Sequence, residues 1–223
     1  MAGNSLQTTA SETTHEREWQ GGFGKEYSER NYLTPSELDA LYEKRYGVGI
    51  TRRAVNLRFL TDVPGDARVL EVGSNLGNQL CMLHEMGFTN LTGIEINSEI
   101  ARDAQLRLPA ARLAEGSALQ IPYPDANFDL IFTSGLLIHI APKDLPIAMS
   151  EIHRCSKTWI WGAEYYAPEM TEVPYRGHRN LLWKTDYARQ YLESFPDLKL
   201  VLEERLPYLK DSNIDTMFLL RRK

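Results

Sequence analysis

Short apolar runs alternate with longer segments of helical periodicity through most of this 223-residue chain. The apolar runs predict strands near residues 68–72, 91–95, 112–114, 128–134, 158–164, 198–205 and 214–221. The segments between them predict helices near residues 76–87, 97–107, 144–155 and 184–194. Strands that alternate with helices usually pair in parallel and are covered on both faces. The pattern therefore predicts an α/β fold with a mostly parallel, Rossmann-like sheet.

The first sixty residues differ from the rest of the chain. Polar residues fill positions 1 to about 15, which we expect to form a flexible tail. Thr34 and Glu37 have the spacing of a capping box, and Pro35 stands at the first helical position. We therefore expect one helix from Pro35 to about residue 46 and a second helix over residues 51–60.

An apolar run over residues 69–72 ends in a glycine turn, and a second run, about twenty residues later, ends in Glu95. This layout is typical of a βαβ unit that binds a ribose-bearing cofactor at the carboxyl end of its sheet. Glu95 can accept hydrogen bonds from two ribose hydroxyls. A dinucleotide-binding pattern that starts at Gly73 would need glycines at positions 75 and 78, which are Asn75 and Asn78.

Residues 71–77 read Glu-Val-Gly-Ser-Asn-Leu-Gly, with an acid two residues before the first glycine. This stretch resembles motif I of class I methyltransferases, which use S-adenosylmethionine (SAM). Three further stretches follow in the order of that family: Glu115–Ala118, Asn127–Gly135 and Leu136–Pro142. The resemblance covers roughly residues 66–223 and implies a seven-stranded sheet with an antiparallel last strand. Asn75 replaces a glycine of many members, but Asn tolerates left-handed backbone angles.

A narrower resemblance, to methyltransferases associated with pseudaminic acid biosynthesis, extends over nearly the whole chain. It rests on four stretches: Trp19–Asn31, Tyr165–Glu169, Val173–His178 and Leu182–Asp186. The resemblance implies that residues 1–60 form a tail and a helical lid over SAM, and that residues 61–223 form the methyltransferase domain. The alternative for the first stretch is a hydrophobic strap packed on the sheet edge.

The motifs and the resemblance together predict the residues that bind SAM. They are Tyr27, Arg30, Glu71, Gly73, Asn75, Gly77, Glu95, Ile96, Ser117, Ala118 and Ser134. Arg30 would pair with the methionine carboxylate and Glu95 with the ribose. Glu71 lies inside an apolar strand, where a buried acid is costly without partners. It either contacts the cofactor or holds the loop by hydrogen bonds.

The methyl acceptor is expected beside the fourth and fifth strands. His139 is the candidate base, because it follows the fourth strand and its neutral form is available at physiological pH; the alternative is a packed histidine. Tyr175 is a second candidate catalytic residue. The substrate-binding candidates on the following loop are Tyr165, Tyr166, Arg176, His178 and Lys184. The cationic ones, with Arg179, suit one phosphate or carboxylate; the alternative is a solvated loop.

Composition narrows the class of acceptor. The net charge is −5 and the sequence pI is about 5.6, which disfavours nucleic acid, whose binding depends on a basic surface. We expect no signal peptide, no membrane span and no metal site, and hence a cytoplasmic enzyme. The oligomeric state is left open.

The predicted function is methyl transfer from SAM to an O or N atom of a small polar acceptor. The acceptor is expected to be a sugar or amino-sugar derivative of surface-glycan biosynthesis. Two alternatives are an NAD(P)-dependent oxidoreductase on a similar sheet and a non-catalytic SAM-binding protein.

Overall fold

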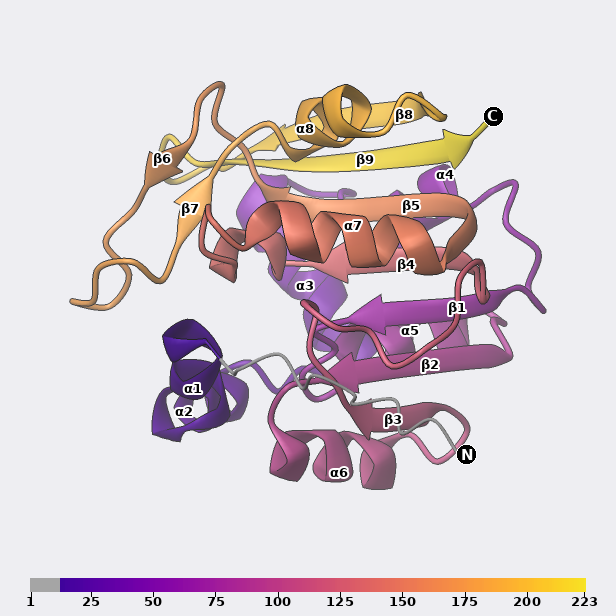
Figure 1. The fold of residues 1–223 in the computed structure, drawn as a ribbon, viewed down its shortest axis with the longest axis horizontal. Coiled ribbons are helices and arrows are strands. Elements are labelled where there is room, and N and C mark those ends of the chain that lie inside the picture. The colour runs from indigo at the N-terminus through magenta and orange to yellow at the C-terminus, as the bar shows by residue number, and fades with distance from the viewer. Residues whose placement is uncertain (1–12) are drawn as a thin grey trace, which may run out of the picture.

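The computed structural model of the protein describes residues 13–223. Within them, seven strands form one sheet in the order β3-β2-β1-β4-β5-β9-β8 (Figure 1). The strands are Arg68–Val72 (β1), Asn90–Glu95 (β2), Arg112–Glu115 (β3), Phe128–Ser134 (β4), Ser156–Tyr165 (β5), Leu198–Pro207 (β8) and Ile214–Arg222 (β9). β1 to β5 pair in parallel, and β9 runs antiparallel to β5 and β8. The predicted fold class is confirmed.

Helices cover both faces of this sheet (Figure 1). α3 (Pro35–Tyr46), α4 (Arg52–Phe59) and α5 (Asn78–Glu85) share one apolar core with the sheet. α7 (Leu145–Cys155) and α8 (Tyr187–Ser194) share a second core on the opposite face. α6 (Ser98–Arg107) packs beside β3 at the sheet edge. All five parallel strands end at the same edge of the sheet, so that edge collects the residues that follow each strand.

The start of α3 follows the local signals of the sequence. The Thr34 side chain accepts a hydrogen bond from the Glu37 amide at 3.3 Å, and the Glu37 carboxylate accepts one from the Thr34 amide at 2.8 Å. Pro35 occupies the first turn, where its missing N–H leaves no helical hydrogen bond unmade. The capping box that the sequence predicts is therefore present, and α3 ends at Tyr46 as expected.

Several elements lie outside the residue ranges predicted for helices and strands, although a helical lid was expected within residues 1–60. Two helices, α1 (Thr14–Gln20) and α2 (Gly22–Arg30), form the N-terminal segment. A short 3-10 helix, η1, spans Leu137–His139. Two short antiparallel strands, β6 (Thr171–Glu172) and β7 (Trp183–Lys184), form a hairpin. Thr13 and Glu16 make a second capping box for α1, a signal that the sequence contained. The helix α2 begins with Gly22, and a Cβ at Gly24 would lie 1.8 Å from the Trp19 carbonyl oxygen, so only glycine fits there. Most of the expected flexible tail lies outside the described residues.

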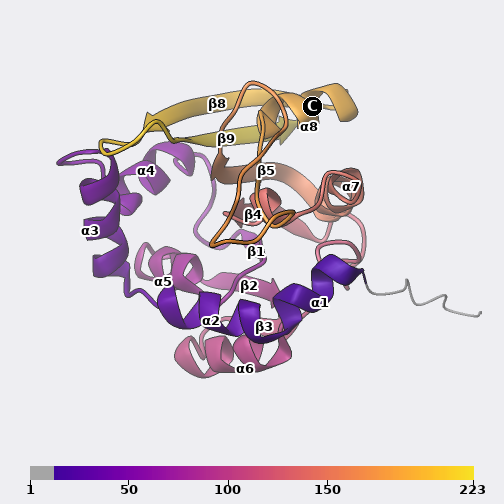
Figure 2. The same cartoon turned by 90° about the vertical axis from the view of Figure 1, so that its left-hand side faces the viewer.

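Figure 2 looks onto the carboxyl edge of the sheet, and α1 and α2 run across it. The first sixty residues therefore divide into two parts. α1 and α2 cover the strand ends, whereas Leu38, Val55 and Phe59 of α3 and α4 are buried in the core that covers one face of the sheet. The part of the chain from residue 13 onward contains no helix with the length and apolar character that a membrane crossing requires.

Candidate cofactor and acceptor site

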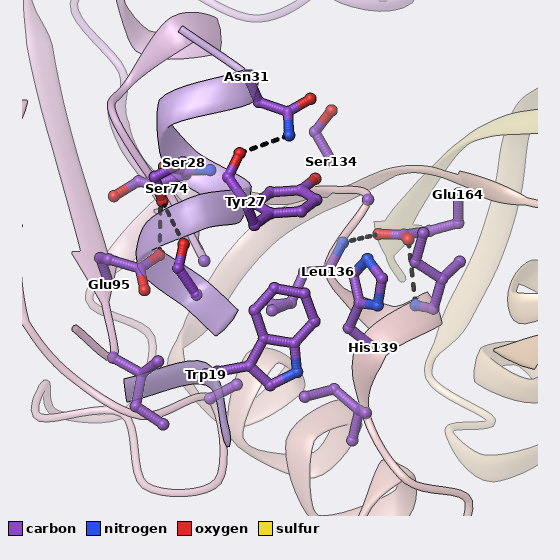
Figure 3. A pocket seen from close by; sticks show the side chains of 18 of the residues that line it. Trp19, Tyr27, Ser28, Asn31, Ser74, Glu95, Ser134, Leu136, His139 and Glu164 are labelled. Carbon is purple, nitrogen blue, oxygen red and sulfur yellow. Dashed lines mark hydrogen bonds between the residues drawn. The ribbon is translucent and has the colours of Figure 1, made fainter. Parts of the chain in front are cut away.

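A cavity of about 310 Å³ lies at the carboxyl ends of β1, β2, β4 and β5, and residues of α1 and α2 also line it. Its cofactor half is lined by Glu71, Gly73, Asn75, Glu95, Ile96, Ser117 and Ala118. Its acceptor half is lined by Arg45, His139, Glu164, Tyr165, Tyr175 and Asp215. Trp19 and Tyr27 project from the two N-terminal helices between Glu95 and Glu164 (Figure 3).

The turn after β1 leaves space at the floor of the cofactor half. Gly73, Asn75 and Gly77 have φ angles of 71°, 48° and 72°, in the left-handed region. A Cβ at Gly73 would lie 2.6 Å from Leu136 Cδ1, so a larger residue would collide there as well as strain the backbone. Asn75 takes the left-handed angle that the sequence predicts for it. Gly77 caps α5 and does not line the cavity.

Glu95 ends β2 with its carboxylate held in place. Its Oε2 accepts a hydrogen bond from the Asn75 amide at 3.0 Å, and its Oε1 accepts one from the Asn97 amide at 3.1 Å. Burial raises the pKa of Glu95, and the backbone amides act in the opposite direction. A carboxylate can accept about four hydrogen bonds, so both oxygens retain capacity for a vicinal diol such as a ribose.

The first N-terminal helix closes the cofactor half from the other side. Ser117 Oγ donates to Glu16 Oε1 at 2.5 Å, and Asn97 Nδ2 donates to the Gln20 carbonyl at 2.8 Å. Ile96 and Ala118 provide the apolar walls next to Ser117. These hydrogen bonds connect α1 to the loops after β2 and β3, and these loops would enclose an adenine.

Glu71 lies in β1 with 2% of its surface exposed, and its Oε2 has no hydrogen-bond partner. Burial raises its pKa well above the usual range, while the buried Arg52 acts in the opposite direction. No hydrogen bond joins its side chain to the loop amides within residues 13–223, so the expected loop-holding role is not what the geometry shows. Glu71 instead presents an acid to the cavity.

Aromatic side chains of the N-terminal helices pack against the residues after β4. The ring centroid of His139 lies 4.5 Å from that of Trp19 and 5.9 Å from that of Tyr27 (Figure 3). Burial raises the pKa of Tyr27, so this phenol stays protonated. Arg30 is exposed, pairs with Glu26 at 3.5 Å and does not line the cavity. Arg30 therefore lies outside the cavity where the cofactor is expected, because the opposite face of α2 points inward.

His139 has one nitrogen committed to the protein. Its Nδ1 lies 2.7 Å from the Leu181 carbonyl oxygen, which can only accept, so the proton is on Nδ1 and Nε2 carries the lone pair. Burial lowers the pKa of His139 to about 4. The side chain is therefore neutral at physiological pH, as expected, and it is a weak base.

Glu164, near the end of β5, is a cavity residue that the sequence analysis did not single out. It is 1% exposed, and its carboxylate accepts hydrogen bonds from the amides of Leu136 at 3.2 Å and Ile138 at 3.4 Å (Figure 3). Burial raises its pKa to about 7, while hydrogen bonds from Thr133 and these amides act in the opposite direction. Glu164 thus titrates near neutral pH beside His139.

The loop after β5 contributes less to the cavity than the sequence suggested. Of the candidate residues there, Tyr165 at the end of β5 and Tyr175 on the loop line the cavity; Ser134, at the end of β4, also lines it. Tyr166 instead packs under Arg205, Lys184 bonds to Asn213 and lies over the Tyr165 ring, and Arg176 and His178 are exposed. Arg176 and His178 lie on the connection between β6 and β7, and neither they nor Lys184 line the cavity.

Comparisons with known proteins agree with this geometry. Residues 70–158 match a methyltransferase domain family. The chain is 29% identical over 94 residues to the uncharacterized methyltransferase sll0829 of Synechocystis sp.; the match covers 42% of this chain and 43% of the relative, less than half of that curated protein.

Solved structures share the fold at low identity. A SAM-dependent methyltransferase of Leishmania major is 16% identical with a TM-score of 0.70, over 94% of this chain and 87% of that chain. The 1,6-didemethyltoxoflavin-N1-methyltransferase of Burkholderia thailandensis, solved with 1,6-didemethyltoxoflavin and S-adenosylhomocysteine, is 17% identical with a TM-score of 0.63, over 77% of each chain. Residues 70–158 thus match a methyltransferase domain, and the chain shares the fold of these solved methyltransferases.

Of the residues expected at the cofactor, the structure brings together Gly73, Asn75, Glu95, Ile96, Ser117, Ala118 and Ser134 at this cavity. Several cavity residues were not predicted, and two of them, Glu164 and Arg45, were missed for different reasons. Glu164 gave the same signal as Glu95, an acid at the end of an apolar strand. Arg45 lies on α3 and gave no local signal, because only the packing of α3 against β9 brings it to the cavity.

Proposed function

We propose that this chain transfers a methyl group from SAM to an O or N atom of a small polar acceptor. The observation that carries this proposal is one continuous cavity with Glu95 at one side, Glu164 at the other and α1–α2 above both. A cavity of about 310 Å³ is within the size range of small-molecule sites.

The cofactor half fits SAM. The turn at Gly73 has no side chain at the point of closest approach, Glu95 would accept hydrogen bonds from the ribose, and Ile96 and Ala118 would bound the adenine. Glu71 would face the ammonium group of the methionine portion. When bound, SAM supplies an electrophilic methyl group on a sulfonium. The chain's own contribution is to hold the acceptor in line with that methyl group.

A base is needed when the acceptor attacks through a hydroxyl or a protonated amine. Two side chains of the acceptor half can serve. His139 offers Nε2, but its pKa of about 4 makes it a weak base; Glu164, with a pKa of about 7, matches a reaction near neutral pH. We assign proton removal to this pair, with Tyr175 orienting the attacking atom. The rate should therefore rise as pH increases through about 7.

We further propose that the acceptor is a sugar or amino-sugar derivative of surface-glycan biosynthesis, methylated in the cytoplasm. The resemblance of Trp19–Asn31 and Val173–His178 to methyltransferases associated with pseudaminic acid biosynthesis supports this. The net charge of −5 and the narrow cavity weigh against nucleic acid, which needs an extended basic track.

Calorimetry tests the cofactor first. The protein should bind SAM and S-adenosylhomocysteine (SAH) and should not bind NAD or NADP. Binding of NAD or NADP alone would favour the oxidoreductase alternative. A methylation screen on sugar nucleotides, sugar acids and small amines, read as the mass gain of one methyl group, then tests transfer. Tight SAM binding without transfer to any acceptor would favour the non-catalytic SAM-binding alternative.

A further inference from the structure

Arg45 is the one arginine or lysine, within residues 13–223, that lines the cavity. It lies near the end of α3, where this helix meets the start of β9 and the end of β5. Asp215, the nearest acid, is the register partner of Tyr165 across the β5–β9 pair. The predicted anion-binding residues Arg176 and Lys184 do not line the cavity, so Arg45 is the cation that a buried anion would meet.

The guanidinium of Arg45 is held on one side only. Its Nη1 donates to Asp215 Oδ2 and to the Tyr46 hydroxyl, both at 3.5 Å, and its Cζ lies 4.9 Å from the centre of the Tyr208 ring. The Arg45 carbonyl also accepts a hydrogen bond from the Leu209 amide at 2.9 Å. These contacts fix the side chain before any ligand arrives, which lowers the entropy lost on binding.

Asp215 is occupied by its own partners. The Tyr46 hydroxyl donates to its Oδ2, and the Tyr208 hydroxyl lies 3.2 Å from both of its oxygens. Asp215 therefore orients Arg45 without taking all of its donors. Nε and Nη2 of Arg45 make no hydrogen bond to residues 13–223, and the side chain is 28% exposed. That edge of the guanidinium is the pair of donors that a carboxylate accepts side by side.

We propose that Arg45 binds a carboxylate of the methyl acceptor, so that the acceptor is a small hydroxy or amino acid, such as a sugar acid. This inference rests on the proposed function. The acceptor would lie between Arg45 and Glu164, with its carboxylate on α3 and its attacking atom at the end of β4 and β5.

Two features favour an acceptor carboxylate over the other anions. Three strands, β1, β4 and β5, separate the β2 strand of Glu95 from β9, a span of roughly 19 Å at the usual strand spacing. The Arg45 end of the cavity is therefore far from the ribose side. Asp215 and Glu164 line the same half, so a doubly charged phosphate would meet more repulsion than a singly charged carboxylate.

The test uses the full-length protein saturated with SAH, and D-glucuronate, D-glucose and glucose 6-phosphate as probes, with dissociation constants from calorimetry or ligand-observed NMR. In wild type, glucuronate should bind at least tenfold more tightly than glucose and more tightly than glucose 6-phosphate. Arg45→Gln should remove the preference for glucuronate, and Arg45→Lys, which keeps the charge beside Asp215 but loses the paired donors, should retain part of it. Lys44→Gln, an exposed neighbour on α3, is the matched control and should keep the whole preference.

Affinities for SAH and for methylthioadenosine, which lacks the amino-acid portion, report on the cofactor half and on folding. Both should be unchanged in Arg45→Lys and Arg45→Gln. A loss of SAH affinity with methylthioadenosine affinity intact would assign Arg45 to the methionine carboxylate and overturn the proposal. So would an unchanged glucuronate preference in Arg45→Gln, no preference in wild type, or a preference for glucose 6-phosphate. If wild type binds no SAH, the proposed function itself fails, which is a separate outcome.

Discussion

Around β1 and β2, most residues that face the cavity come from residues 71–97, a single stretch with one glycine turn and one terminal acid. Around β4, β5 and β9, they come from separate segments: Arg45 from α3, His139 from η1, Glu164 and Tyr165 from β5, and Asp215 from β9. The cofactor half depends on local geometry and backbone amides. The acceptor half depends on how distant elements pack.

The two halves also use their carboxylates differently. Glu95 is partly exposed and accepts hydrogen bonds from the amides of Asn75, in the glycine turn, and Asn97, whereas Glu164 is buried and accepts hydrogen bonds from the amides at the start of η1. A side chain that binds an invariant cofactor, as proposed for Glu95, can belong to a short sequence motif. A group that selects an acceptor can change with the packing around it, and the following predictions test this contrast.

The largest expected effect is on stability in the acceptor half. The folded-state pKa of Glu164 is about 7, above its usual 4.5, so the folded protein binds more protons than the unfolded chain between these values. The free energy of unfolding of wild type, relative to Glu164→Gln, should therefore fall by about 3 kcal/mol as pH rises from below 4.5 to above 7. Urea unfolding of both proteins across this range measures the difference. A difference that does not vary with pH would mean that the Glu164 carboxylate is solvated.

The next effect is on cofactor binding. Glu95→Ala should weaken SAH binding by roughly 1.5–3 kcal/mol, the value of hydrogen bonds to a charged group. Glu115→Ala is the matched control, because Glu115 is exposed and pairs in register with Glu95 at the end of the neighbouring strand. Calorimetry should show a loss for Glu95→Ala only. Equal affinities in a folded Glu95→Ala protein would remove Glu95 from the ribose site.

Removal of the N-terminal helices should affect both halves to a smaller extent. Deletion of residues 1–32 removes Glu16, Trp19 and Tyr27 but leaves the cores around the sheet intact. Because aromatic contacts contribute about 0.5–1.5 kcal/mol each, SAH affinity should fall roughly tenfold. Circular dichroism checks the fold and calorimetry the affinity. If the truncated protein binds SAH as tightly as wild type, α1 and α2 are a strap packed on the sheet edge and not a lid over the cofactor.

The smallest effects are expected at the cationic residues outside the cavity. Arg30→Ala and Arg176→Ala should each change SAH affinity by less than about twofold, since isolated exposed substitutions usually shift free energies by under 0.5 kcal/mol. For Arg176→Ala, any change should appear in the acceptor KM rather than in cofactor binding. A tenfold loss of SAH affinity in either variant would place that residue in the cofactor half. The cofactor half would then not depend on the local motif alone.

Local rules were enough for much of the fold. The capping box at Thr34, the strand ending at Glu95 and the left-handed Asn75 each follow from interactions between residues close in sequence, and the structure contains all three. The alternation of strands and helices likewise predicted the sheet, because each element must bury an apolar face. For the same reason, most residues that the motif assigned to the cofactor lie at one cavity, and their role in binding stays a prediction.

The acceptor half was decided by tertiary packing. Nothing near Arg45 in the sequence indicates that α3 brings it against Asp215, 170 positions away. Arg30 and Arg176 have the right charge, but the face of α2 that packs inward and the hairpin of β6 and β7 leave both outside. Composition and spacing determine which chemistry is available, whereas long-range burial determines which side chains reach the cavity and with what pKa, as at Glu164.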